Sequence, residues 1–370
     1  MNIMKEKFNE ICLNSKLVGA SCVMMKRGVI QEAMAYGSSS LEEKRLATPY
    51  TVYRIASISK TVMALALMKV VEDYHVMIED DISIYFGFLI RNPNYPSVPI
   101  TIKMLLTQTS SITDGKEDES TGYNLVNGTN QDVFLKDLLL PGGSRFVSET
   151  FDSHQPGTTF IYANFNCGIL SCLIEKVTGV LFTEYVKDIV FKPLGLDASY
   201  RPSDIVNSDI ATLYYPEGDG VRIARTADSF IKNEYKIFPL GENYRGPAGG
   251  LFINMVDLSR IASVFLNQGK PILKKETIEL MLKVHWKGPR NGSYQAKGLQ
   301  MVILDDFKTR LYGHFGDAYG VKSFMLFNPV EEIAITFITN GGHYRYQKSG
   351  ICDVHEQMIQ GFLDQYGDPQ

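Results

Sequence analysis

The stretch "YRIASISKTVMALALMKVVED", residues 53 to 73, joins a serine and a lysine to a long apolar segment. Ser57 and Lys60 are three residues apart, so a helix that begins near Ser57 carries both side chains on one face. The residues that follow are apolar around nearly the whole helix, which is typical of a helix buried at the centre of a domain. The stretch therefore predicts a central helix with a serine and a lysine together at its N-terminus.

Such a pair has a chemical use and an ordinary alternative. A serine hydroxyl becomes a nucleophile beside a base, and a lysine amine can be that base if burial lowers its proton affinity. The N–H groups at a helix N-terminus also favour negative charge developing there. Ser229 and Lys232 have the same spacing without the surrounding signals, and a helix-capping serine beside a solvated lysine explains either pair. The spacing alone leaves catalysis and capping open.

Composition and charge exclude several classes of protein. The chain has 370 residues, of which 45% are hydrophobic and 21% charged, and these values are typical of a globular protein. Its net charge is −4 and it has no basic stripe, so we expect no nucleic-acid partner. The N-terminus lacks the apolar block of a signal peptide, and no segment reaches about 18 uninterrupted apolar residues. We therefore expect a cytoplasmic protein without a membrane partner.

Cysteine and histidine spacing gives no sign of a metal site. The five cysteines have no CxxC spacing, which favours reduced, buried thiols, and the six histidines form no HExxH pattern. We expect neither a metal nor a cofactor.

Strand patterns occupy both ends of the chain and helical patterns its middle. Residues 18–37 predict a hairpin around Lys26–Gly28, and residues 321–341 predict a second hairpin around Asn328 and Pro329, followed by a closing helix at 350–367. Helical patterns cover residues 57–73, 101–109, 165–192 and 255–268. This order predicts an α+β fold in which an antiparallel sheet from both termini is flanked by helices and a mainly helical lobe is inserted between.

A second motif, Tyr162-Ala163-Asn164, precedes the apolar segment at 165–192 and is the only YxN in the chain. A tyrosine hydroxyl can pass protons between a nucleophile and a leaving group, and an asparagine amide can hold a substrate carbonyl and a lysine together. A strand-edge tyrosine and a capping asparagine are the structural alternative.

A third motif, His314-Phe315-Gly316, is the only HxG and lies on a strand-like segment before the second hairpin. We expect Gly316 to let a substrate approach the backbone closely. The N–H of Asp317 could then complete an oxyanion hole with the N–H of Ser57. A structural histidine on a strand is the alternative.

Taken in order, the three motifs resemble those of the serine β-lactamase and penicillin-binding-protein superfamily, specifically its class C β-lactamase-like branch. Three further stretches are similar to that branch: "ITIKMLLTQTSSI" (100–112), "PGTTFIYANFNCGILSCLIEKVTG" (156–179) and "GPAGGLFINMVDLSRIASVFLNQG" (246–269). The resemblance covers roughly residues 15 to 345. It implies one catalytic domain over 1–370, with a sheet lobe from about 1–56 plus 245–370 and a helical lobe from about 57–244.

The resemblance also implies an acyl-enzyme mechanism. Ser57 would be the nucleophile, Lys60 and Tyr162 would share the acid and base work, and Asn164 would orient them and the substrate. His314 stands where class C β-lactamases have a lysine, and a histidine there is seen in some D-Ala-D-Ala carboxypeptidases, D-aminopeptidases and esterases of the superfamily.

Phe315 departs from the family pattern, which commonly has a threonine whose hydroxyl binds the carboxylate of penicillins and D-Ala peptides. We therefore expect weaker recognition of a free C-terminal carboxylate. Asp317 could pair with a cationic group of the substrate, although a solvated turn residue that contributes only its backbone is the simpler alternative.

The sequence thus predicts a serine hydrolase that cleaves a small ester, amide or short peptide, such as a β-lactamase-related esterase or a D-amino-acid peptidase. A D-Ala-D-Ala carboxypeptidase or β-lactamase that binds penicillin is the alternative within the same class. A catalytically silent binding protein on the same fold is the alternative from another class. One sequence carries no prediction of the oligomeric state.

Overall fold

The computed structural model describes residues 3–116, 121–206 and 209–367. Both predicted hairpins are present: β1 (Gly19–Lys26) with β2 (Val29–Ser40), and β12 (Val321–Asn328) with β13 (Ile333–Thr339). β1 pairs antiparallel with β13, so the two ends of the chain meet in one sheet. The prediction of an antiparallel sheet made from both termini is therefore confirmed.

The sheet has nine strands in the order β3-β2-β1-β13-β12-β11-β10-β9-β8. Every pairing within it is antiparallel. The five strands outside the two hairpins are β3 (Arg45–Leu46), β8 (Trp286–Asn291), β9 (Tyr294–Gly298), β10 (Met301–Leu304) and β11 (Leu311–Ala318). Two-stranded ribbons are formed by β4 (Tyr53–Arg54) with β7 (Phe252–Ile253) and by β5 (Leu213–Glu217) with β6 (Gly220–Arg225).

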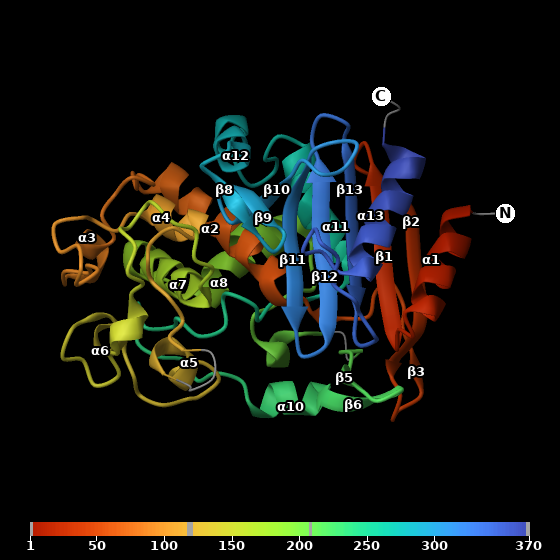
Figure 1. Ribbon diagram of the computed structural model, residues 1–370, viewed down its shortest axis with the longest axis horizontal. Helices are drawn as coiled ribbons and strands as arrows, with labels where there is room; N and C mark the ends of the chain where they lie inside the picture. The colour runs from red at the N-terminus through yellow and green to blue at the C-terminus, as the bar shows by residue number, and fades with distance from the viewer. Residues whose placement is uncertain (1–2, 117–120, 207–208, 368–370) are drawn as a thin grey trace.

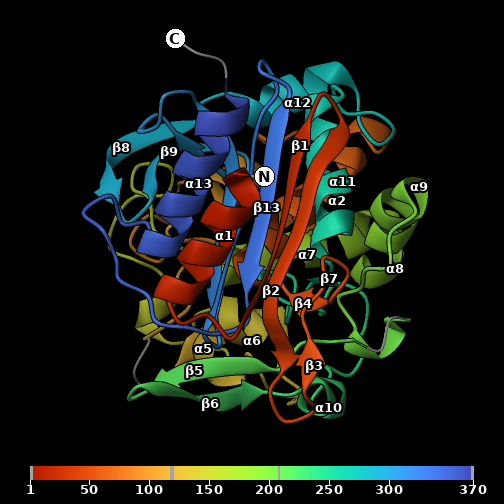
Figure 2. The same ribbon diagram turned by 90° about the vertical axis from the view of Figure 1, so that its right-hand side faces the viewer.

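Helices cover both faces of the sheet (Figure 2). The first helix, α1 (Ile3–Asn14), and the last, α13 (Asp353–Tyr366), lie side by side on one face, and α11 (Met255–Leu266) packs on the other. The closing helix predicted at the C-terminal end of the sequence is confirmed as α13.

The remaining helices gather at the β8 end of the sheet, on the left of Figure 1. The predicted helix over 165–192 is wrong in one respect, because Gly179 adopts φ +72° and ends α7 (Asn164–Thr178) there. The short helices that complete this set are α3 (Ser83–Phe86), α4 (Ile102–Thr107), α5 (Gly122–Val126), α6 (Leu135–Leu139), α8 (Phe182–Val186), α9 (Lys192–Leu194) and α12 (Lys275–Leu282). Helix α10 (Ala227–Lys232) lies instead beside the β5–β6 ribbon (Figure 1).

Helix α2 (Ser59–Asp73) runs through the middle of the molecule, between the sheet and the helices of the other end (Figure 1). Its residues from Ser59 to Met68 are all buried, as the apolar pattern predicts. Burying a leucine or methionine side chain contributes about 1.5–3 kcal/mol, so this helix anchors the core. Its N-terminus consequently emerges where the sheet meets the helices.

Within the described residues no single helix is long and apolar enough to cross a bilayer. Helix α7 and residues Phe182–Leu194 reach that length and apolar content only together, and the chain bends by 83° between them.

Candidate active site

Ser57 lies in a single 3-10 turn, Ala56–Ile58, directly before α2. Ala56 has φ +52°, a left-handed conformation that is unusual for a residue with a Cβ atom. The turn is held by its neighbours: Ser59 Oγ donates to the Ala56 carbonyl at 2.6 Å, and Ser323 Oγ on β12 donates to the Ile55 carbonyl at 3.0 Å. The strained turn therefore has fixed support on both sides of the serine.

Lys60 is fully buried in the first turn of α2. Its Nζ donates to Ser57 Oγ at 2.9 Å, to Asn164 Oδ1 at 2.8 Å and to the Ala248 carbonyl at 2.8 Å. Burial lowers the pKa of Lys60 to about 8, while the charge of Asp114 opposes that change. Both sequence conditions for a lysine base, proximity and burial, are therefore met.

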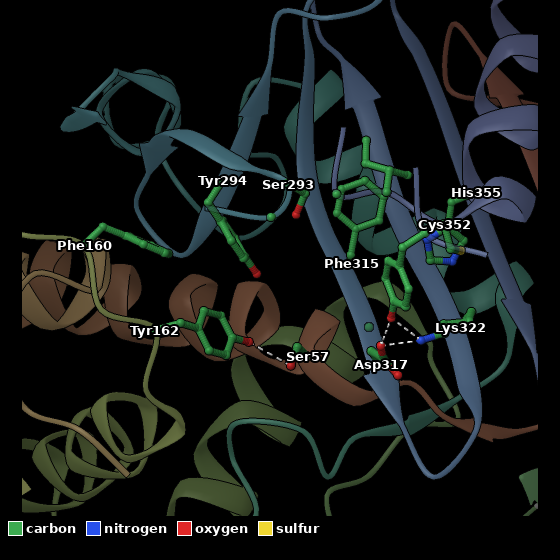
Figure 3. Close-up of a pocket in the computed structure, with 15 residues that line it drawn as sticks. Ser57, Phe160, Tyr162, Ser293, Tyr294, Phe315, Asp317, Lys322, Cys352 and His355 are labelled. Carbon is green, nitrogen blue, oxygen red and sulfur yellow. Dashed lines mark hydrogen bonds and ion pairs between the residues drawn. The ribbon is translucent and has the colours of Figure 1, made fainter. Parts of the chain in front are cut away.

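The hydroxyl of Tyr162 also donates to Ser57 Oγ, at 2.9 Å (Figure 3), and Lys60 Nζ lies 4.8 Å from the centroid of the Tyr162 ring. Burial raises the pKa of Tyr162, so this phenol carries its proton at neutral pH. The ring of Tyr294 on β9 packs against that of Tyr162, with 5.5 Å between their centroids. Ser57 Oγ thus accepts hydrogen bonds from a lysine and a tyrosine.

Asn164, the first residue of α7, is oriented by a carboxylate that sequence reasoning missed. Asp114 accepts from the Asn164 amide Nδ2 at 2.9 Å and from the backbone N–H groups of Asn164 at 2.9 Å and Phe165 at 2.8 Å. Asp114 therefore caps α7 from a distant loop and turns Asn164 Oδ1 toward Lys60. Burial raises the pKa of Asp114, although these three donors and Lys60 oppose the change.

His314 on β11 is fully buried, and its ring lies 6.4 Å from that of Tyr162, centroid to centroid. Its Nδ1 lies 2.6 Å from the Phe315 carbonyl; because a carbonyl only accepts, Nδ1 carries the proton. Burial lowers the pKa of His314 well below its usual range, so the imidazole is neutral. His314 lines neither of the two cavities beside Ser57.

Lys297 on β9 is a second fully buried lysine that sequence reasoning did not identify. Its Nζ lies 4.9 Å from the centroid of the Tyr294 ring and 6.0 Å from that of Phe160. Burial, helped by the nearby charge of Lys60, lowers the pKa of Lys297 to about 7. Its only sequence signal is one lysine beside an apolar strand, which is too weak to interpret.

Gly316 has a packing role in addition to the role that the sequence suggests. A Cβ atom there would lie 2.2 Å from Ser323 Oγ and 2.5 Å from the Ile55 carbonyl oxygen. The glycine therefore lets β11 pack against the turn that carries Ser57. Gly316 also lines a cavity beside Ser57, so close approach of a substrate to its backbone stays a prediction.

The end of β11 has an open side. β10 pairs with β11 only as far as Gly313, whereas β12 pairs with it through Ala318, among the residues that the structure describes. Asp317 lies on this open part of the strand and lines both cavities with Ser57. Its carboxylate accepts hydrogen bonds from Lys322 and Tyr346, so Asp317 is a strand residue with partners of its own, although its side chain is exposed.

On one side of Ser57 an apolar cavity of about 310 Å³ opens (Figure 3). Phe315 forms part of its wall, where its ring stacks on His355 with 5.4 Å between centroids. Phe160, Tyr294, Ile351 and Cys352 extend the apolar lining, and the paired Asp317 and Lys322 also line this cavity. Phe315 thus faces the cavity, as its place in the third motif suggests.

On the other side of Ser57 lies a polar cavity of about 300 Å³. Tyr123 on α5, together with Asn127 and Gly128 at the end of that helix, contributes to it. Arg54 and Tyr319 form the wall toward β4. Ser57 therefore stands between two cavities of similar size and opposite character.

The remaining sequence candidates behave as their structural alternatives predict. Ser229 of the second SxxK accepts a hydrogen bond from the Thr226 N–H at 2.9 Å and so completes the capping box at the N-terminus of α10. All five cysteines are buried and unpaired. Cys167 lies near Lys60, but burial raises the pKa of its thiol to about 12, which makes it unreactive.

Comparison with known proteins identifies the family. The sequence model of the family described as Beta-lactamase matches residues 6–350. Protein flp of Staphylococcus aureus (strain N315) is 26% identical over 326 residues, which cover 87% of this chain and 59% of the relative. The chain therefore spans about three fifths of the length of the curated relatives that it matches first.

Solved structures share the fold at low sequence identity. D-amino acid amidase from Ochrobactrum anthropi SV3, complexed with D-phenylalanine, superposes with a TM-score of 0.74 at 19% identity over 98% of both chains. EstCE1, described as a hydrolase with promiscuous acyltransferase activity, has a TM-score of 0.77 at 19% identity over 99% of this chain and 98% of its own. The chain belongs to the beta-lactamase family and has the fold of its serine hydrolases.

Proposed function

We propose that this protein cleaves esters or amides through an acyl-enzyme formed on Ser57. The observation that carries the proposal is the environment of Ser57 Oγ, which lies 2.9 Å from both Lys60 Nζ and the Tyr162 hydroxyl. Family membership and the hydrolase names of the structural neighbours support the same reaction class.

Lys60 is the base in this mechanism because of what its partners can do. Asn164 Oδ1 and the Ala248 carbonyl only accept hydrogen bonds, so a neutral Lys60 directs its two N–H groups to them. Its lone pair then faces Ser57, whose proton it takes as Ser57 Oγ attacks the substrate carbonyl. Tyr162 keeps its proton until the leaving group needs it and then acts as the general acid.

The N–H groups of Ser57 and Asp317 would hold the oxyanion of the tetrahedral intermediate. Collapse of this intermediate releases the alcohol or amine and leaves the acyl group on Ser57. Water then attacks the ester: its proton passes to Tyr162, which gave its own to the leaving group, and Lys60 returns to Ser57 Oγ the proton that it took in the first step. His314 and Gly316 are positioning residues in this mechanism. His314 acts through the neighbouring Tyr162, and Gly316 acts through the turn that carries Ser57.

The apolar wall at Phe315 favours substrates without a free carboxylate on that side of Ser57. A phenyl ring supplies no hydrogen bond, and here it fills the place of a hydroxyl. Small esters and amino-acid amides are therefore favoured over D-Ala-D-Ala peptides and penicillin. The D-amino acid amidase among the structural neighbours supports including D-amides among the candidates.

A first experiment tests whether Ser57 reacts. The protein is treated with a fluorophosphonate probe and its adduct is located by peptide mass spectrometry, followed by turnover of a pool of short esters, D- and L-amino-acid amides, a D-Ala-D-Ala peptide and a penicillin. Labelling of Ser57 and turnover that disappears in Ser57→Ala are expected. Lys60→Ala should lose about 10²- to 10⁴-fold in kcat/KM, whereas Lys232→Ala in the second SxxK should lose none.

An unlabelled Ser57 with no turnover would instead favour the silent binding protein. Cleavage confined to the D-Ala-D-Ala peptide or the penicillin would favour the cell-wall enzyme.

A second experiment tests Phe315. Phe315→Thr restores the hydroxyl and should raise kcat/KM for carboxylate-bearing substrates about tenfold relative to their methyl esters. An unchanged ratio would show that Phe315 does not set this preference.

A further inference from the structure

Arg54 presents a half-buried positive charge to the polar cavity beside Ser57. The residue lies on β4, three residues before the nucleophile. Its guanidinium lies over the ring of Tyr319 at 5.1 Å from the centroid. Among the residues that the structure describes, no side chain or carbonyl forms a hydrogen bond or an ion pair with it. Its five N–H donors are therefore available to a ligand in the cavity.

The other charged groups around this cavity are already balanced within the described chain. Asp317 pairs with Lys322. Glu234, which lines a smaller basin on the far side of Arg54, pairs with Arg201. Lys60 and Asp114 lie beneath the floor and oppose each other's charge. One half-buried positive charge is thus left over.

A further cation strengthens this field from the outside. Arg225 on β6 has its guanidinium 4.8 Å from the centroid of the same Tyr319 ring. It is exposed and screened by solvent, so it attracts an anion without holding it. The remaining lining of the cavity is polar and supplies hydroxyl and amide groups from Tyr123, Asn127 and Tyr235.

We propose that Arg54 makes this cavity a subsite for a carboxylate carried by the substrate, on the opposite side of Ser57 from the Phe315 wall; the inference rests on the hydrolase function proposed above. A planar guanidinium binds a carboxylate through two parallel hydrogen bonds, and one unbalanced positive charge matches one negative charge. The substrate class is therefore an ester or amide with an apolar group at one end and an anionic group at the other.

The test uses two matched pairs of chromogenic esters. In the first pair, 4-nitrophenyl hydrogen adipate is compared with its methyl ester, so the charge lies on the acyl part. In the second, 3-butyryloxybenzoate is compared with its methyl ester, so the charge lies on the leaving group. We expect the anionic member of one pair to have a kcat/KM about 10- to 100-fold higher than its neutral partner. Added salt should reduce that ratio.

Variants of Arg54 assign the preference. Arg54→Gln should bring the ratio close to one, and Arg54→Lys, which keeps the charge, should retain most of it. Arg222→Gln is the matched control, because Arg222 is an exposed arginine on the same ribbon as Arg225 and lines neither cavity. If the wild-type protein hydrolyses the esters but its kcat/KM ratio of anionic to neutral ester is near one for both pairs, the inference is overturned. The hydrolase function is then still supported by the turnover. An equal loss on both members in Arg54→Gln would also overturn the inference, because Arg54 would then act only through the fold.

A binding measurement keeps the inference separate from turnover. Monomethyl adipate should raise the Tm of Ser57→Ala, and the double variant Ser57→Ala with Arg54→Gln should lose that shift. If no ester is hydrolysed but this Arg54-dependent shift is present, the hydrolase proposal fails and the anion subsite is supported. If the shift does not depend on Arg54, the subsite is overturned.

Discussion

The three N–H groups of a protonated Lys60 have three acceptor atoms: Ser57 Oγ, Asn164 Oδ1 and the Ala248 carbonyl oxygen. Of these three oxygen atoms, only Ser57 Oγ carries a proton that it can donate. Because its pKa is lowered to about 8, Lys60 loses its third proton as pH rises through that value. We expect kcat/KM for a neutral ester to rise about tenfold per pH unit below pH 8 and to level off above it. A profile that is flat between pH 6 and pH 9 would remove Lys60 as the base.

Lys297 offers a test of stability at the same scale. Its pKa in the folded state, about 7, lies below the ordinary value of 10.5, so the unfolded chain binds the extra proton between these values. The contribution of Lys297 to the free energy of unfolding of the wild-type protein therefore rises with pH between about 7 and 10.5. Lys297→Met removes the buried charge and should raise the free energy of unfolding by about 1–4 kcal/mol at pH 6, with a gain that shrinks as pH rises.

The measurement is urea unfolding at pH 6, 8 and 10. Lys287→Met on the neighbouring strand β8 is the control, because Lys287 is exposed and should show no such pH-dependent gain. Destabilisation by Lys297→Met at every pH would show that the amine makes contacts worth more than its burial costs.

The residues that meet at Ser57 divide into those that a local pattern identifies and those that only the fold assembles. Lys60 and Asn164 belong to short motifs whose spacing has a chemical meaning in the sequence itself. Asp114 and Lys297 carry no such spacing, because each reaches the site from a separate loop or strand. Arg54 lies in the same stretch of sequence as Ser57. Within the described residues its guanidinium is nevertheless left without a carboxylate partner only because the fold pairs the nearby carboxylates with other cations, which the sequence does not show.

Among the elements, α7 depends on a residue outside it. Asp114→Ala leaves three N–H groups without their acceptor and should lower the free energy of unfolding by about 1–3 kcal/mol. It also removes a negative charge that raises the pKa of Lys60. The inflection in the pH profile of kcat/KM should therefore move to lower pH. Asp132→Asn, on an exposed carboxylate that pairs with Lys236, is the control for both readouts.

A loss of stability with an unmoved inflection would mean that Asp114 is only a helix cap.

The contact between β11 and the turn at Ser57 is a second dependence between elements. Gly316→Ala places a methyl group 2.5 Å from the Ile55 carbonyl oxygen, so the strand and the turn must separate. We expect kcat/KM to fall at least tenfold, since a small displacement of Ser57 disturbs its alignment with Lys60. Gly220→Ala on β6 is the control, because its Cβ atom would meet nothing closer than 3.8 Å. Retained activity in Gly316→Ala would show that the turn can yield without cost.

Element boundaries show where sequence patterns stop being sufficient. The apolar run from 165 to 192 predicts one helix, and only the left-handed conformation of Gly179 divides it. The strands β8 to β10 follow a region of mixed pattern, and their place in the sheet depends on pairing with β11. Hairpins at both ends were predictable because each has alternating apolar residues around a recognisable turn.

For the whole molecule, the cluster beneath α1 and α13 reaches the apolar cavity through residues such as Phe315 and Cys352, but most of it serves stability. The cluster beneath α1 and α13 includes the fully buried Phe8, whereas Ser57 lies beyond the opposite face, at the N-terminus of α2. Phe8→Ala should lower the free energy of unfolding by about 3–5 kcal/mol while kcat/KM at 25 °C stays at the wild-type value. Leu13→Ala, on a residue that is 66% exposed, should change stability by less than about 0.5 kcal/mol. Thermal unfolding and ester turnover are measured on the same samples. A parallel fall in stability and in kcat/KM for Phe8→Ala would contradict the expected separation of stability from activity.

The overall architecture was largely predictable because its two ends have the clearest strand patterns and its centre the clearest helix pattern. The long polar segments between them remained undefined, since their conformation depends on contacts such as the one between Asp114 and α7.

The placement of Ser57 between an apolar and a polar cavity gives the site a direction. A molecule with two cleavable bonds can lie across the serine in two orientations, and these differ in which end meets the Phe315 wall and which meets Arg54. Only one orientation matches both linings, so an unsymmetrical diester would be cut at a single one of its bonds. The enzyme would thus be regioselective without any contact to the bond that it spares.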